Sequence, residues 1–275
     1  MTPGYGLGPM ADPSTRLLEL VREAISAGLR YIDTAASYDA VEERLGQLAE
    51  FLRRHHVRLC TKLTATAIDG LSQALQRLRC ERVDTVLVHN ASVDDLRDQQ
   101  VGERLIQAKR QGHVAHLGAS TYGEDDARMA LQQPWCEVVQ VEHSLLNPTV
   151  VHTLAGLKRP GQELVVRSVL CKGLLTSRRR YAADLPAEAH ARLDRLEGIA
   201  AAWGFSLPEL AIRFALDTPA VDLVLVGISD LHELETALAA AQRPSLEPWQ
   251  RDVLQAFDCS TEDWSHPERW RADAR

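Results

Sequence analysis

Four polar residues in the first third of the chain carry groups that general acid–base catalysis uses: a carboxylate, a phenol, an ammonium and an imidazole. Asp33, Lys62 and His89 each end a short run of β-branched residues, and Tyr38 follows in the loop after Asp33. Each one alone has an ordinary structural interpretation, as a turn residue, a solvated charge or a packed histidine. At the ends of successive strands they form a candidate catalytic cluster.

The elements that must position these residues are short strands that alternate with helical sequence. Apolar residues recur with helical spacing at 17–24, 68–78 and 231–241, and Ser206 with Glu209 forms a capping box at a helix start. The β-branched runs are 31–33, 57–62, 83–89, 114–118, 138–141, 164–167 and 221–226. This alternation predicts a parallel sheet, since parallel neighbours need a crossover connection.

The Gly-rich opening at 4–8 supplies an eighth strand, so the sequence predicts an α/β fold, a (β/α)8 TIM barrel. An open doubly wound sheet is the competing fold, but the only glycine motif, at 4–8, lacks the Rossmann spacing and runs into Pro9 rather than into a helix. No linker or change of composition marks a boundary. We therefore expect one domain over residues 1–275, with 258–275 as a C-terminal tail.

Composition and charge exclude several function classes. The chain has 31 Lys and Arg against 38 Asp and Glu, and its net charge of −7 gives no general attraction to nucleic acid or anionic membranes. No apolar stretch reaches the roughly 18 residues of a membrane span. The five cysteines are scattered, and no secretory leader precedes them, so we predict reduced thiols and a cytoplasmic location. The histidines lack metal-site companions, and no metal is expected.

The segment from Gly28 to Gly46 resembles the aldo-keto reductase signature, in which G-x-R-x-x-D-T-A leads to a tyrosine and then to E-x-x-x-G. Later segments agree with that family in the same order, namely 61–62, 88–89, 117–120, 139–140, 167–176 and 226–229. The resemblance implies a (β/α)8 barrel that transfers hydride between a nicotinamide cofactor and an aldehyde or ketone, or the corresponding alcohol. The alternative is a non-catalytic or regulatory cofactor-binding barrel similar to the potassium-channel β-subunits.

The resemblance also implies the catalytic roles. Asp33 holds Lys62 charged and oriented, and Lys62 stabilises the anionic form of Tyr38 when that phenol gives up its proton. His89 donates a hydrogen bond to the substrate oxygen. An ammonium about 4 Å from a phenol contributes up to ~4 kcal/mol at an effective dielectric near 20, which is enough to favour this transfer.

The positions that the resemblance assigns to cofactor binding depart from the family in part. Thr121 replaces the asparagine that follows the serine in relatives, and Arg167 replaces an aromatic residue found in many of them. The assigned residues are Ser120, Gln140, Arg167, Ser168, Gly173, Leu174, Gly227, Ser229 and Glu233. Arg178 to Arg180 are either phosphate partners or an exposed basic turn.

Cofactor choice depends on the start of the last barrel helix, where relatives that prefer NADPH usually present a basic residue to the 2′-phosphate. This sequence offers Asp230 and Glu233, and a carboxylate there would repel a phosphate and accept a hydrogen bond from a ribose hydroxyl. The cofactor is therefore NADPH or NADH, with the hypothesis of an NADH preference or weak NADPH selectivity. The partner is a small carbonyl or alcohol substrate; its identity and the oligomeric state stay open.

The two ends of the chain carry separate expectations. The first expected strand begins close to Met1, which predicts that the N-terminal β-hairpin that plugs the barrel floor in relatives is missing. At the other end, the tail is polar and holds Trp264 and Trp270. It either folds over the barrel mouth, as in the family, or packs outside the barrel; we favour the first.

Overall fold

The computed structural model describes residues 7, 13–38, 40–182 and 185–266, which form two compact units. Among these residues, the first unit comprises 13–141 and 154–165, and the second comprises residue 7, 142–153 and 166–266. Strands β5 (Val138–Glu142) and β6 (Glu163–Arg167) and helix α8 (Thr149–Ala155) each cross from one unit into the other.

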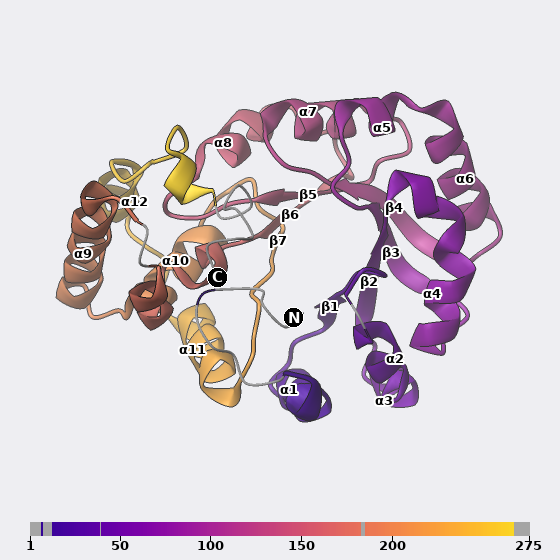
Figure 1. The fold of residues 1–275 in the computed structure, drawn as a ribbon, viewed down its shortest axis with the longest axis horizontal. Coiled ribbons are helices and arrows are strands. Elements are labelled where there is room, and N and C mark those ends of the chain that lie inside the picture. Colours follow the sequence, from indigo (N-terminus) through magenta and orange to yellow (C-terminus); the bar gives the residue numbers. More distant parts are fainter. Residues whose placement is uncertain (1–6, 8–12, 39, 183–184, 267–275) are drawn as a thin grey trace. The chain divides into compact units, whose positions relative to one another are not determined.

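In the first unit, strands follow one another in chain order, and neighbours from β1 to β5 are parallel. They are β1 (Tyr31–Asp33), β2 (Arg58–Leu63), β3 (Val83–Val88), β4 (Val114–Ser120) and β5. The helices are α1 (Pro13–Ser26), α2 (Val41–Gly46), α3 (Ala49–Arg54), α4 (Leu71–Leu78), α5 (Val93–Arg97), α6 (Gln99–Arg110) and α7 (Glu124–Gln132), with a 3₁₀ segment η1 (Ala65–Gly70) before α4. Figure 1 shows α2 to α7 along one side of these strands, where their apolar stripes form the core.

In the second unit, the end of β6 meets β7 (Leu223–Val224), and the amide N–H of Leu225 donates to Val166 O at 2.8 Å. Its helices are α9 (Ala187–Ala202), α10 (Leu207–Leu216), α11 (Leu231–Gln242) and α12 (Pro248–Gln255), and its 3₁₀ segments are η2 (Cys171–Gly173), η3 (Ser177–Tyr181) and η4 (Asp263–Ser265). Helix α10 is mostly buried and forms the centre of this unit's core.

The α/β alternation predicted from the sequence is confirmed in the described chain. Each of the seven runs from 31–33 to 221–226 contains a strand, and the strand order is sequential from β1 to β7. A doubly wound sheet instead reverses its order at a switch point, so that alternative is wrong. The predicted capping box is present, since the Glu209 carboxylate accepts from Ser206 N at 2.7 Å. The expected strand at 4–8, apart from Leu7, and the predicted loss of the β-hairpin lie outside the described residues.

Helix α2 is fixed to its neighbours by a buried ion pair and a close backbone contact. The Glu42 carboxylate is 1% exposed and accepts from Thr61 Oγ1 at 2.5 Å and from Arg77 Nε at 2.7 Å. Gly46 lies so close to α4 that a β-carbon on it would stand 2.2 Å from Arg77 O. These contacts hold α2, which begins directly after the loop with Tyr38, against β2 and α4.

Replacement of Gly46 by alanine is expected to destabilise the protein by about 1–3 kcal/mol, because the added methyl group forces α2 away from α4. The matched control is Gly198→Ala in α9, where a β-carbon meets no atom within 4 Å and helix propensity favours alanine by about 0.5–1 kcal/mol. The melting temperature should therefore fall for Gly46→Ala and rise for Gly198→Ala. An equal or higher melting temperature for Gly46→Ala would show that the contact is not tight.

His143 is a buried neutral histidine in the second unit. The Thr218 hydroxyl donates to Phe214 O at 3.0 Å, so it must accept from His143 Nε2 at 2.9 Å. The imidazole stacks on the Phe214 ring, and its Nδ1 is buried without a hydrogen-bond partner among the described residues. Burial, with a smaller contribution from His152, lowers the pKa of His143 from 6.5 to about 3.

This shift predicts that stability falls in mild acid. Between pH 6.5 and pH 3 the unfolded chain binds a proton at His143 that the folded chain does not, so the free energy of unfolding decreases as the pH falls, by at most about 1.4 kcal/mol per pH unit. Above pH 6.5 this contribution is constant. Melting temperatures of the wild type and His143→Phe across pH 4–7 should show a shallower acid slope in the variant; parallel slopes would contradict the assignment.

Candidate functional site

The first unit brings Lys62 and Asp33 together as a buried ion pair. The Lys62 side chain is 1% exposed, and its Nζ donates to Asp33 Oδ2 and, at 2.9 Å, to Thr34 O. A buried ammonium must have acceptors within reach, because the loss of water around a charge is costly. The end of β1 supplies both acceptors, since β1 ends at Asp33 and Thr34 follows it directly, and Lys62 lies next to the end of the neighbouring strand β2.

The electrostatic surroundings keep Lys62 charged. Burial is the largest influence and by itself lowers the pKa of Lys62, but the adjacent Asp33 carboxylate, with smaller contributions from Cys60 and Tyr38, outweighs burial. The net effect raises the pKa of Lys62 above its ordinary value of 10.5. Lys62 therefore carries its positive charge throughout the neutral range.

Tyr38 and His89 lie beside this pair. Lys62 Nζ is 5.3 Å from the centroid of the Tyr38 ring, and the Tyr38 and His89 rings meet edge to face with centroids 5.9 Å apart. His89 directly follows β3, its amide N–H donates to Leu63 O at 2.8 Å, and its Nδ1 lies 3.4 Å from Ser37 Oγ. The four residues expected to form one cluster are thus brought together by three strand ends and one loop.

Two of the expected cofactor residues join the same cluster. Ser120 is buried at the end of β4 and Gln140 is buried in the middle of β5, and Ser120 Oγ donates to Gln140 Oε1 at 3.0 Å. Gln140 Nε2 donates in turn to Asp33 Oδ1 at 2.9 Å. This link is not predicted from the sequence, because Gln140 lies inside its strand and not at the strand end where the other polar residues are found. Thr121, at the position of the family's asparagine, is fully buried, and its N–H donates to Gln140 O.

The remaining expected cofactor residues lie in the second unit, where several follow the end of β6. Arg167 ends β6, and its Nη1 donates to Ser168 Oγ at 3.2 Å. The loop that follows is strained, because Ser168, Cys171 and Lys172 all have positive φ values. Gly173, at φ 104°, and the buried Leu174 complete the loop.

At the start of α11, both acidic side chains already have partners. The Glu233 carboxylate accepts from the N–H and the hydroxyl of Ser229, each at 2.7 Å, and Asp230 Oδ1 accepts from Glu233 N at 2.8 Å. Arg178 Nη2 lies 3.2 Å from Glu233 Oε1 and 3.3 Å from Ser229 Oγ. A basic residue, Arg178, therefore lies at the start of α11, but it comes from η3 and not from α11 itself. Gly227 is exposed nearby in sequence, after β7.

The three arginines predicted to be either phosphate partners or an exposed basic turn have separate surroundings. Arg178 belongs to the cluster with Glu233, whereas Arg179 pairs with Asp194 and Glu197 of α9. Arg180 is exposed and covers the ring of Tyr181. Arg178 alone of the three contacts an expected cofactor residue.

Comparison with known proteins decides the family. The sequence profile of the Aldo/keto reductase family matches residues 4–256, nearly the whole chain. The chain belongs to the aldo-keto reductase family. This aldo-keto reductase is therefore an NAD(P)-dependent oxidoreductase, and the fold of its family is a (β/α)8 barrel.

Two relatives that align with most of the chain have low sequence identity to it. The uncharacterized oxidoreductase YqkF of Bacillus subtilis is 23% identical over 282 aligned positions, with 92% of this chain and 91% of that protein covered. L-galactose dehydrogenase of Arabidopsis thaliana is 25% identical, with 86% and 81% covered. Among solved structures, the holo form of aldo-keto reductase AKR11C1 from Bacillus halodurans superposes with a TM-score of 0.77 at 20% identity, covering 93% of this chain and 90% of that one.

The described part of the C-terminal tail packs on the loop after β5 within the second unit. Cys259 N donates to Leu146 O at 2.8 Å, and Asn147 Nδ2 lies 3.2 Å from His266 Nδ1. His266 Nε2 donates to Ser260 O at 2.8 Å, which closes the tail on itself. The tail is thus anchored at the carboxyl end of a strand of the reductase; its role in the substrate pocket stays a prediction.

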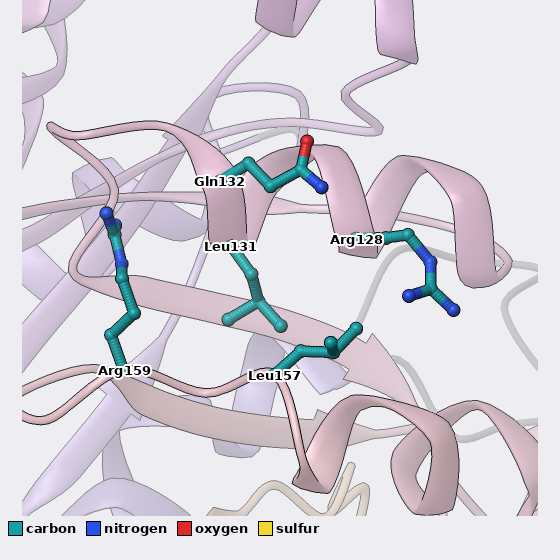
Figure 2. A pocket seen from close by; sticks show the side chains of 5 residues that line it. All are labelled: Arg128, Leu131, Gln132, Leu157 and Arg159. Carbon is teal, nitrogen blue, oxygen red and sulfur yellow. The ribbon is translucent and has the colours of Figure 1, made fainter.

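A separate pocket of about 300 Å³ lies between α7 and the segment that leads to β6. Figure 2 shows Leu131 and Leu157 facing each other between Arg128 and Arg159. Both guanidinium groups have partners, Glu124 and Gln133 O respectively. No member of the catalytic cluster lines this pocket, so it is not a candidate active site.

No three or more His, Cys, Asp or Glu side chains within the described ranges are arranged to hold a metal ion. No single helix in the same ranges is long and apolar enough to cross a membrane, and only the bent pair α9 and α10 reaches that length and apolarity together.

Proposed function

We propose that this reductase transfers hydride between a nicotinamide cofactor and an aldehyde or ketone, or the corresponding alcohol, with Tyr38 as the proton donor. The observation that carries the proposal is the buried Lys62 ammonium, which Asp33 holds against the Tyr38 ring beside His89. This arrangement favours catalysis over a non-catalytic cofactor-binding barrel. The single domain over 1–275 and the cytoplasmic location are part of the same proposal.

The buried amide of Gln140 fits a nicotinamide carboxamide. It uses one N–H for Asp33 and one lone pair for Ser120, which leaves one N–H and one lone pair. A primary carboxamide offers the complementary acceptor and donor, and a fully buried amide needs such partners. When bound, the cofactor supplies hydride to a carbonyl carbon or accepts it from an alcohol.

The chain's own residues provide the proton. As a carbonyl carbon gains hydride, its oxygen becomes basic and takes the proton of the Tyr38 hydroxyl. The charged Lys62 stabilises the phenolate left behind, and an imidazole N–H of His89 stabilises the negative charge that develops on the substrate oxygen. In the oxidative direction the same groups remove the alcohol proton.

Tyr38→Phe is expected to lower kcat for carbonyl reduction by at least about a hundredfold, because it removes the proton donor and leaves the surrounding cluster in place. A panel of aldehydes, ketones and sugars with both cofactors, followed at 340 nm, identifies the substrate for this comparison. Cofactor affinity, measured by fluorescence titration, should stay close to that of the wild type. Undiminished reduction by the variant would rule out the proposed mechanism.

We also propose that Glu233 disfavours the 2′-phosphate of NADPH. Its carboxylate already takes the Ser229 N–H, the Ser229 hydroxyl and the Arg178 guanidinium, which are the donors that a phosphate at this helix start would need. The Glu233 carboxylate and a 2′-phosphate would therefore compete for the same hydrogen-bond donors. NADH has no phosphate to compete and leaves the cluster intact.

Fluorescence titration of the wild type should show NADH binding at least as tightly as NADPH. Glu233→Gln should improve NADPH affinity relative to NADH by about tenfold, because Ser229 and Arg178 are released from a charged competitor. The control is Glu235→Gln, the same change of charge at an exposed position of α11. Wild-type binding of NADPH more than tenfold tighter than NADH would refute the preference.

A further inference from the structure

We propose that Asp33 is a positioning residue for cofactor binding as well as the counter-ion of Lys62: it fixes which way the Gln140 amide faces and thereby the orientation of the carboxamide that Gln140 receives. The inference rests on the proposed function, in which Gln140 binds the nicotinamide carboxamide. It adds a physical coupling between the proton-donating residues and the cofactor-binding ones.

The coupling runs through one chain of hydrogen bonds. Ser120 Oγ donates to Gln140 Oε1 at 3.0 Å, and Gln140 Nε2 donates to Asp33 Oδ1 at 2.9 Å. The other carboxylate oxygen, Asp33 Oδ2, accepts from Lys62 Nζ. Ser120, Gln140 and Lys62 are at most 1% exposed, and the Asp33 side chain is 18% exposed. Water therefore has little access with which to replace a lost partner.

Only an ionised carboxylate fits between these two donors. It accepts at both oxygens and donates at neither, so Gln140 must turn its NH₂ group toward Asp33 and its oxygen toward Ser120. The reverse orientation would place Gln140 Oε1 against Asp33 Oδ1, two acceptors with no proton between them. Ser120 cannot fix the amide by itself, because a hydroxyl both donates and accepts.

The fixed amide determines what an incoming carboxamide meets. The remaining N–H and lone pair of Gln140 are presented in one order, so a carboxamide finds matching partners in one orientation and loses them when it is turned over. In this arrangement Asp33 acts on the carboxamide through Gln140. Lys62 donates to the opposite oxygen of Asp33.

Asp33→Asn tests this arrangement because asparagine has one oxygen and one NH₂ group. The buried Lys62 ammonium requires the oxygen, so the NH₂ group faces Gln140, and the Gln140 amide turns over to accept from it. Lys62→Met is the matched control: it removes the donor on the other side of Asp33 and leaves an oxygen of Asp33 to hold Gln140.

Dissociation constants of NADH and NADPH would be measured by fluorescence titration on the full chain, with thermal melting to verify folding. We expect Asp33→Asn to weaken binding at least about tenfold and Lys62→Met less than about threefold, although both lose kcat. In the Gln140→Ala background, Asp33→Asn should cause no further loss, because the residue through which it acts is gone.

The outcomes separate this inference from the proposed function. If Gln140→Ala weakens binding but Asp33→Asn does not, the inference is overturned and Gln140 keeps its cofactor role. If Gln140→Ala binds like the wild type, the assignment of Gln140 is wrong and the inference fails with it.

A second pair of variants covers a failure of Asp33→Asn to fold. Gln140→Glu places two carboxylates face to face, and the exchange Asp33→Asn with Gln140→Glu restores a donor and an acceptor at that contact. The exchanged protein should melt at a higher temperature than Gln140→Glu alone. An equal or lower melting temperature would overturn the proposal.

Discussion

The buried ammonium of Lys62 is the constraint on which the site depends. With 1% of its side chain exposed, it cannot rely on water, and the protein must supply acceptors or lose the charge. Asp33 and the carbonyl of Thr34 supply them, and both come from the end of β1. In the proposed mechanism, the charged Lys62 stabilises the negative charge that Tyr38 acquires when its phenol gives up a proton.

The surrounding elements serve that arrangement. The parallel register pairs Asp33 with Cys60, two residues before Lys62, so both strands end at the same edge. Glu42 and Gly46 hold α2 against β2 and α4, which restricts the loop that carries Tyr38. Gln140 ties the middle of β5 to the same carboxylate. The packing of α2 thus restrains the loop with Tyr38, and the hydrogen bond from Gln140 restrains the carboxylate of Asp33.

Much of this site could be predicted because strand ends of a parallel sheet converge whatever the details of packing. Asp33, Lys62 and His89 were found in that way. The contact of Gln140 with Asp33 depends on side-chain conformations, which residue spacing does not determine. Arg178 reaches Glu233 across 55 positions of sequence, and that meeting depends on how η3 and α11 pack. Residue spacing therefore does not reveal the partners of Glu233.

The ionisation of Lys62 tests the central claim most directly. Lysine ¹⁵Nζ resonances, with Lys62 assigned by its absence in Lys62→Met, can be followed from pH 6 to the alkaline limit of folding. The account predicts that Lys62 stays protonated to a pH above 10.5, because Asp33 outweighs burial, and that Asp33→Asn lowers its midpoint. A wild-type midpoint below 10.5 would contradict the account, since burial would then control the charge on which the proposed chemistry depends.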